Sequence, residues 1–361
     1  MTAERGASLR MTAKSYAPLK MTGWPLLFAQ KPLGFRGLRI GPDECCLGAA
    51  GDGRAKRRQN PKTGMYDRYP KRNCEVRRQT PSMIGKTCLV TGANSGIGKA
   101  IAQGLAARGS RVLMVARSRE KGETARVKVS ASTRNQAVEL LVCDLASQRQ
   151  VRDLAATVVE RCNRLDVLVN NAGLILAERT LTEDGIETTF AVNHLAPFLL
   201  TNLVRERMEQ SAPSRIVTVA SGVHHGGKID FEDPSAEKGF SGWRAYSQSK
   251  LANVLFTREL ARRVHGTGVT ATCLHPGMVR TGFCRQGPDS FYFRNWLGRL
   301  LLISPKKGAD TAVWLATSPE VEGASGGYYK KRRLTNPSQT ACDPGISRRL
   351  WELSERLTGL N

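Results

Sequence analysis

Short apolar segments alternate with amphipathic ones from residue 86 onward. Six segments are almost continuously apolar and rich in β-branched residues: TCLV from 87, RVLMVA from 111, VELLVC from 138, LDVLVN from 165, RIVTVA from 215 and VTATCLH from 269. Between them, apolar residues recur with a period of about 3.6 in 99–108, 148–161 and 247–264. Strands that are apolar on both faces and alternate with helices predict a parallel sheet covered on both sides. We therefore expect one α/β domain, a doubly wound parallel sheet of Rossmann type, over 83–361.

The first 82 residues lack this alternation. They open with a degraded ten-residue echo (MTAERGASLR, MTAKSYAPLK, MTGWPLLFAQ), and they contain 17 lysines and arginines against 6 acidic residues. Such a composition buries too little apolar surface to offset chain entropy, so we expect 1–82 to be a basic, disordered extension. The alternative is that Met83 is the working start of the protein. In that case 1–82 is not normally made.

Bulk composition narrows the class of protein. The net charge of +24 would suggest a nucleic-acid partner, but nearly half of the excess lies in 1–82, so no nucleic-acid partner is expected for the domain. No apolar run approaches the roughly 18 residues of a membrane span, and no secretory signal is visible. The 9 cysteines form no C-x-x-C pair. We expect neither disulfides nor a metal site, and a cytoplasmic location.

The stretch TGANSGIGKA at 91–100 joins the first predicted strand to a helix. Gly92 allows a tight turn, while Gly96 and Gly98 let a pyrophosphate approach the backbone and let the helix pack closely. The amides at the helix start would then face the anion. A flexible corner that binds nothing is the alternative for this motif taken alone.

The end of the second strand indicates which dinucleotide would bind. NAD-preferring domains usually place an acid here, but this sequence has Arg117, followed by Arg119 and Lys121. A guanidinium suits the 2′-phosphate of NADP, whereas the two later cations are more simply solvated surface residues. Asp144, after the third strand, would meet the adenine edge or, alternatively, cap the next helix.

Four further fragments carry candidate chemistry. NNAG ends the fourth strand at 170–173, VNHL contains Asn193, and TVASG contains Ser221. YSQSK places Tyr246 and Lys250 four residues apart, hence on one face of a helix. A cap, a polar helix position and a core tyrosine would explain these residues singly. Their order after the glycine turn favours one shared site.

From about residue 84 to 361 the chain resembles the short-chain dehydrogenase/reductase family, with T-G-x-x-x-G-x-G, N-N-A-G, an asparagine, a serine and Y-x-x-x-K in the family's order. TGANSGIGKA, NHLAPFLLTNL, SKLANVLFTRELARR, LHPGMVRT and SRRLWELSERLTGL resemble its retinol dehydrogenase-like group. Ala220 departs from the second serine usual there. The N-terminal membrane anchor of many animal relatives is not apparent, which puts membrane association and a retinoid role in doubt.

The resemblance implies a mechanism. Tyr246 would exchange the proton, Lys250 would stabilise its phenolate and bind the nicotinamide ribose, Ser221 would hold the substrate oxygen, and Asn193 would fix a relay water. It also implies a set of residues that contact the cofactor, NADP(H): Gly92, Asn94, Ser95, Gly96, Ile97, Gly98, Arg117, Asp144, Leu145, Asn171, Ala172, Gly173, Tyr246, Lys250, Pro276, Gly277 and Thr281.

Three C-terminal features complete the prediction. The segment 283–303 is rich in aromatic residues and leucine, and we interpret it as a substrate lid, with packing at a subunit interface as the alternative. YYKKRR at 328–333 is expected to be a solvated loop. His224 and His225 have no metal partners at a useful spacing and are expected in a loop near the mouth of the site.

The function that follows is NADP(H)-dependent interconversion of a lipophilic alcohol with its aldehyde or ketone. The alternative is a non-catalytic NADP(H)-binding regulatory protein on the same fold. Intact Ser221, Tyr246 and Lys250 argue against that alternative, because a sensor would not need all three. The resemblance favours a homodimer or homotetramer.

Overall fold

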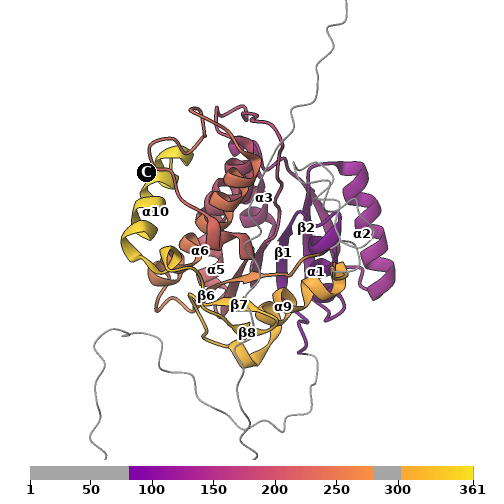
Figure 1. The fold of residues 1–361 in the computed structure, drawn as a ribbon. Helices are drawn as coiled ribbons and strands as arrows, with labels where there is room; N and C mark the ends of the chain where they lie inside the picture. Colours follow the sequence, from indigo (N-terminus) through magenta and orange to yellow (C-terminus); the bar gives the residue numbers. More distant parts are fainter. Residues whose placement is uncertain (1–80, 280–301, 361) are drawn as a thin grey trace, which may run out of the picture. The chain divides into compact units, whose positions relative to one another are not determined.

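The computed structural model describes residues 81–279 and 302–360. Its sheet has the strand order β3-β2-β1-β4-β5-β6-β7-β8, and every neighbouring pair is parallel except β7 and β8 (Figure 1). The strands are β1 (Thr87–Thr91), β2 (Arg111–Ala116), β3 (Val138–Val142), β4 (Val167–Asn170), β5 (Ser214–Val219), β6 (Val269–His275), β7 (Tyr328–Lys330) and β8 (Arg333–Leu334).

Helices connect the parallel strands. They are α1 (Gly96–Ala106), α2 (Arg119–Thr133), α3 (Gln148–Arg161), α4 (Thr188–Phe190), α5 (Ala196–Gln210), α6 (Gly242–Arg263), α9 (Pro305–Thr317) and α10 (Pro344–Thr358). Shorter turns of other helix types are η1 (Ala191–Leu195), η2 (Gly222–Gly226), η4 (Pro319–Val321) and η5 (Thr340–Cys342). η1 is a π-helical turn that runs directly into α5.

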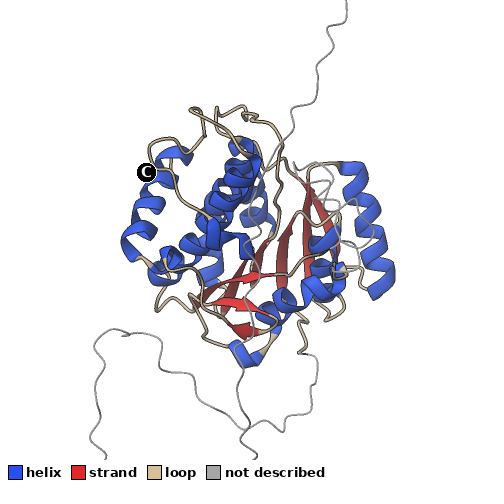
Figure 2. Cartoon of the chain, viewed as in Figure 1, coloured by secondary structure: helices blue, strands red, loops and turns tan. Residues whose placement is uncertain are grey.

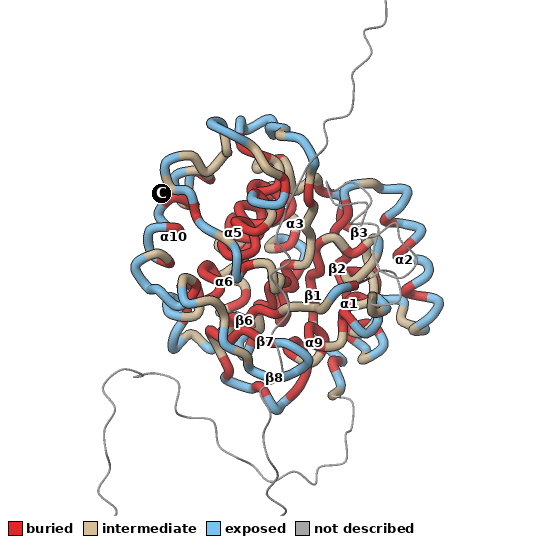
Figure 3. The backbone as a smooth tube through the Cα atoms, in the orientation of Figure 1, coloured by how far each residue is buried: buried red, intermediate tan, exposed pale blue. Residues whose placement is uncertain are grey.

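The helices cover both faces of the sheet (Figure 2). Strand β2 shows why its sequence is apolar without alternation: Val112 and Met114 enter the core shared with α1, α2 and α9, while Leu113 and Val115 enter the core shared with α3, α5 and α6. Both sets of side chains are therefore removed from water, and the central strands are buried along their length (Figure 3). The predicted doubly wound α/β fold is confirmed.

The last described helix, α10, packs on the outside of α6. Trp351 stacks on Phe256 of α6 with ring centroids 5.8 Å apart and meets Phe198 of α5 edge-on at 4.8 Å. The Arg263 guanidinium lies 4.2 Å from the centroid of the Trp351 ring. This aromatic cluster ties α10 to the helix that carries Tyr246 and Lys250.

Most predicted elements appear where the sequence placed them, but the prediction for 328–333 is wrong. YYKKRR at 328–333 is not a solvated loop at its start, because Tyr328 and Tyr329 form β7 beside β6 and are each only 3% exposed. Only the cations that follow make an exposed turn, in which Lys331 and Arg332 have positive φ. The predicted extension lies outside the described residues up to residue 80, and the division of the chain at Met83 stays a prediction.

Candidate active site

The glycine turn after β1 is shaped by close contacts. Gly92 and Gly96 have φ of +64° and +54°, a backbone region that side chains disfavour. A Cβ on Gly92 would lie 2.9 Å from the Cα of Ala172, and a Cβ on Gly98 would lie 2.2 Å from the carbonyl oxygen of Gly92. Helix α1 is thus pressed against the turn in a way that only glycine permits. This cradle fits the pyrophosphate of a dinucleotide.

The start of α1 leaves its amides open. Ser95 occupies the N-cap position, but its side chain accepts no hydrogen bond from the helix, and the first turn contains no acidic residue. Asn94 is half-buried beside it, and Ile97 packs against the core. Unsatisfied amides at a helix N-terminus favour an anionic ligand.

The segment after β4 is fixed to this turn. The backbone amides of Asn171 and Ala172 both donate to the hydroxyl of Thr91, at 2.9 and 3.1 Å. The Asn171 side-chain amide donates to the carbonyl of Thr91 at 2.8 Å. The predicted cofactor residues of β1 and β4 therefore form one rigid wall, which continues into Gly173.

Arg117 and Asp144 follow β2 and β3. Arg117 is exposed, and its guanidinium makes no hydrogen bond or ion pair with another described residue. Asp144 does not cap α3: its carboxylate accepts from the amide of Ala146 at 3.0 Å, and Ser147 is the N-cap. That alternative for Asp144 is wrong, because the loop continues three residues beyond it. Leu145 packs against the core beside it.

Helix α6 carries Tyr246 and Lys250 to the carboxyl ends of the strands. The ammonium of Lys250 lies 5.6 Å from the centroid of the Tyr246 ring and donates to the carbonyl of Val219 at 3.1 Å. Lys250 is buried, and burial lowers its pKa to about 8. A Cβ on Gly173 would lie 3.2 Å from the side-chain oxygen of Asn193, which is a tight approach, and 3.4 Å from this ammonium.

Asn193 lies in the π-helical turn η1, a local irregularity that often marks functional sites. Its side-chain oxygen accepts from the amide of Leu174 at 2.7 Å. Its amide group donates to the carbonyl of Leu174 at 2.9 Å and to the hydroxyl of Ser249 at 3.0 Å. Asn193 thereby joins the segment after β4 to α6. Sequence reasoning missed Ser249, because nothing in YSQSK distinguishes it from a solvated serine.

Ser221 follows β5 and is separated from the last residue of that strand by Ala220. Its hydroxyl accepts a long hydrogen bond from the amide of Val223, at 3.4 Å, so it also acts as the cap of η2. In the described parts of the chain it donates no hydrogen bond, and the residue is half-buried. A hydroxyl with its proton to give suits a substrate oxygen.

The segment after β6 closes the site. Pro276 and Gly277 end the strand, and Gly277 has φ of +91°. A Cβ on Gly277 would lie 2.8 Å from the side chain of Ile303, whose amide donates to the carbonyl of Met278 at 2.8 Å. Thr281 and the predicted lid lie outside the described residues, except for Leu302 and Ile303.

All these groups meet at the carboxyl ends of parallel strands, around the point where the strand order changes from β1 to β4. Ligands of open α/β sheets bind at such a point. Within 81–279 and 302–360 no group of His, Cys, Asp or Glu is arranged to hold a metal ion. No helix in these ranges combines the length and apolarity that crossing a bilayer requires.

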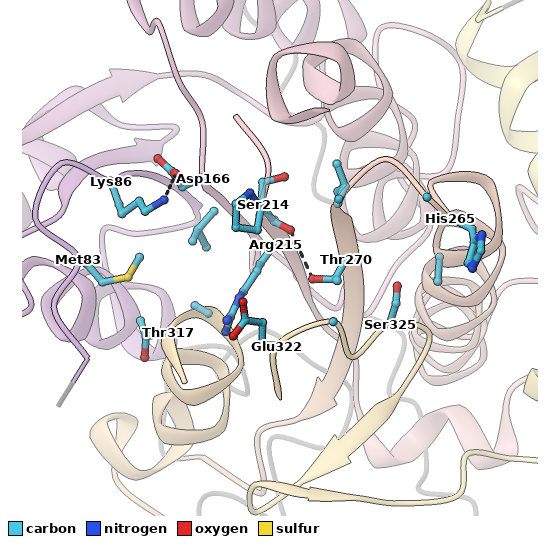
Figure 4. A pocket seen from close by; sticks show the side chains of 18 residues that line it. Met83, Lys86, Asp166, Ser214, Arg215, His265, Thr270, Thr317, Glu322 and Ser325 are labelled. Atoms are coloured by element: carbon cyan, nitrogen blue, oxygen red, sulfur yellow. Dashed lines mark hydrogen bonds and ion pairs between the residues drawn. The ribbon is translucent and has the colours of Figure 1, made fainter. Parts of the chain in front are cut away.

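A hollow of about 580 Å³ lies at the opposite edge of the sheet, where β1, β4, β5 and β6 begin (Figure 4). Buried Asp166 accepts hydrogen bonds there from the amide of Thr87 and from Arg164, and it pairs with Lys86 at 2.9 Å. Arg215 donates to the carbonyls of Leu315 and Ser318 at the end of α9, at 3.0 and 2.8 Å. These charges are matched within the protein.

Comparison with known proteins identifies the family of the chain. A family model described as short chain dehydrogenase matches residues 86–289, more than half of the chain. Retinol dehydrogenase 14 of Homo sapiens is 43% identical over 294 residues, which cover 77% of this chain and 88% of that protein. An uncharacterized protein from Mycobacterium paratuberculosis superposes with a TM-score of 0.64 at 35% identity, covering 78% of this chain and 96% of that chain. A short chain dehydrogenase from Burkholderia cenocepacia in complex with NADP superposes with a TM-score of 0.55 at 26% identity, covering 68% and 96%.

Proposed function

Because the chain belongs to the short-chain dehydrogenase family, whose members interconvert alcohols and carbonyl compounds with a nicotinamide cofactor, we propose that it is an NADP(H)-dependent oxidoreductase of lipophilic alcohols and their aldehydes or ketones. The observation that carries this proposal is the buried ammonium of Lys250 beside the ring of Tyr246. A buried positive charge stabilises the anion of a neighbouring phenol, which is what a proton-exchanging tyrosine requires.

The side chains divide the proton chemistry among them. Tyr246 gives a proton to the substrate oxygen during reduction and takes it back during oxidation. Lys250 stabilises the phenolate in between, and the carbonyl of Val219 orients its ammonium. Ser221 donates a hydrogen bond from its hydroxyl to the same substrate oxygen as charge develops there. Asn193 keeps Leu174 and Ser249 in place around Lys250, and a relay water near it stays a prediction.

The cofactor site fits a dinucleotide phosphate. When bound, a nicotinamide cofactor would supply or accept the hydride. The close packing at Gly92 and Gly98 shapes the turn that would receive the pyrophosphate, and the open amides at the start of α1 would face it. Arg117, exposed and unpaired among the described residues, would bind the 2′-phosphate that distinguishes NADP from NAD.

Two exposed apolar side chains support a lipophilic substrate. Trp243 is 48% exposed and lies one helical turn before Tyr246, with ring centroids 6.2 Å apart. Met278 is 56% exposed and follows Gly277 at the other side of the site. Large apolar groups beside catalytic residues favour an apolar ligand. The retinol dehydrogenase named among the relatives agrees with such a substrate class.

A screen of NADPH oxidation against aldehydes and ketones of increasing chain length tests the proposal. We expect turnover that rises with the apolar area of the carbonyl compound. Tight NADPH binding without turnover of any carbonyl or alcohol would favour the regulatory alternative instead. The same preparations give the oligomeric state, for which a homodimer or homotetramer stays the prediction.

The cellular location is also proposed. The described cysteines Cys88, Cys143, Cys162, Cys273 and Cys342 are all unpaired thiols. A reducing compartment, the cytoplasm, suits them. Fractionation of cells that make the protein would test this.

A further inference from the structure

The peptide unit that follows Ser221 is held on both sides by histidine rings. The carbonyl oxygen of Ser221 accepts from Nδ1 of His224 at 2.6 Å, and the amide of Gly222 donates to Nδ1 of His275 at 3.0 Å. His275 is the last residue of β6, which pairs with β5 directly before Ser221. The peptide plane between Ser221 and Gly222 is thus held by residues of two different elements, η2 and β6.

These contacts determine the proton positions on both rings. A carbonyl only accepts and a backbone amide only donates, so Nδ1 of His224 must carry a proton and Nδ1 of His275 must not. His224 also accepts from the amide of Ser338 through Nε2, at 3.1 Å. Each ring is therefore neutral, in a different tautomer.

The surroundings favour the neutral rings. His224 is fully buried, and its ring meets that of Tyr328 edge-on at 4.8 Å. Burial lowers the pKa of His224, and it lowers that of His275 to about 4 with help from the positive charge of Lys330 nearby. Protonation of His275 at Nδ1 would place a second donor opposite the Gly222 amide and break the hydrogen bond between them.

We propose that His224 and His275 are positioning residues, which hold the Ser221–Gly222 peptide so that the Ser221 hydroxyl points at the substrate oxygen. The inference rests on the proposed function for the role of Ser221, but the clamp itself stands on geometry. Ser221 needs such support, because its own hydroxyl makes only a 3.4 Å contact with Val223. Fixed orientation of a catalytic group is worth more than its hydrogen bond alone suggests.

Nitrogen NMR of histidine side chains tests the clamp without any turnover. The chain has only 5 histidines, so each ring is assignable by substitution. At neutral pH we expect His224 with its proton on Nδ1 and His275 with its proton on Nε2. His225, whose ring makes no hydrogen bond to a described residue, is the matched control and should show no such fixed preference. His224 protonated on Nε2, or His275 on Nδ1, would overturn the clamp.

Paired substitutions test the consequence for Ser221. His275→Leu removes the acceptor and should lower kcat on the order of tenfold, with NADPH affinity unchanged. His275→Asn offers an amide oxygen to Gly222 and should restore kcat to within about threefold of the unmodified protein. His265→Leu, at the opposite edge of the sheet, is the control for loss of an imidazole.

The outcomes separate the two proposals. Equal kcat for His275→Leu and His275→Asn would overturn the positioning role even where the NMR tautomers are as expected. If the unmodified protein turns over no alcohol or carbonyl compound, the proposed function fails, and the tautomers still decide the clamp.

Discussion

Asp166 lies at the edge of the sheet where the parallel strands begin (the amino edge), and Lys250 lies at the edge where they end (the carboxyl edge). Both residues are buried, each 3% exposed. Asp166, at the amino edge, has partners in Arg164, Lys86 and the amide of Thr87. Lys250, at the carboxyl edge, donates to the carbonyl of Val219 and has the ring of Tyr246 nearby.

The difference separates stability from chemistry. Burial by itself would raise the pKa of Asp166, but the hydrogen bonds from Arg164, Thr87 and Lys86 outweigh it and hold that pKa below its usual range. Burial lowers the pKa of Lys250, and among the described residues no carboxylate opposes this effect. A matched charge stabilises the fold, whereas a poorly matched one remains available to act on a ligand.

The largest expected effect is at the carboxyl edge. Tyr246→Phe removes the proton donor and should lower turnover by about 100-fold or more while cofactor affinity stays the same. Steady-state kinetics and NADPH titration measure the two quantities. Tyr329→Phe removes the same atom from the core beside Trp314 and should keep its turnover. A Tyr246→Phe variant that retained more than about a tenth of the rate would contradict the assignment.

Arg117 provides a test at the exposed part of the carboxyl edge. A partly exposed Arg–phosphate contact should give roughly a 10- to 150-fold preference for NADPH over NADH in kcat/KM. Arg117→Asp should narrow or reverse this preference, mainly through KM. Arg119→Asp, two residues further on, is the charge-matched control. Similar kinetics with both cofactors in the unmodified protein would remove the case for Arg117.

At the amino edge the effect should fall on stability alone. Asp166→Asn leaves Lys86 and Arg164 without their carboxylate and should lower the free energy of unfolding by about 2–3 kcal/mol. Denaturant unfolding measures this loss, and kcat of the folded variant should not change. A loss of kcat at full stability would show that the two edges do not divide their roles in this way.

Lys250 offers a smaller test through pH. Between about pH 8 and its ordinary value of 10.5, the folded protein releases the Lys250 proton while the unfolded chain keeps it. The unfolded state then binds more protons, so the free energy of unfolding rises with pH. Relative to Lys250→Met, the cofactor-free protein should gain about 2 kcal/mol from about pH 7.5 to about pH 9.5. A flat difference would mean that the ammonium is solvated.

Much of the fold could be predicted because burial on both faces leaves a plain sequence signal. The bounds of β2, β6 and α3 agree with the apolar and helical patterns. The start of α6 does not agree with the helical pattern. The helix begins at Gly242, five residues before the periodic segment, because Ser241 caps it and Gly242 fits against the carbonyl of Leu176. A cap and a close backbone approach have no periodicity to detect.

Some residues of the site could likewise be predicted from the sequence, and others could not. Spacing brought Tyr246 and Lys250 together, because four residues make one helical turn. His275 and Ser249 could not be predicted, since each acts through a contact with an element far away in the sequence, Gly222 and Asn193. The burial of His224 was missed for the same reason: its partner, Ser338, follows it by 114 residues.

Helix α10 has a consequence for synthesis of the protein. It leaves the ribosome after every other described element, yet its Trp351 covers Phe198 and Phe256 behind the helix that carries Tyr246. Until then the contacts of Trp351 with these aromatic side chains are missing, although the strands from β1 to β4 have already been made. We therefore expect part of this apolar surface to stay uncovered until α10 has been made, so that chaperones that bind such surfaces can bind the nascent chain at this late stage.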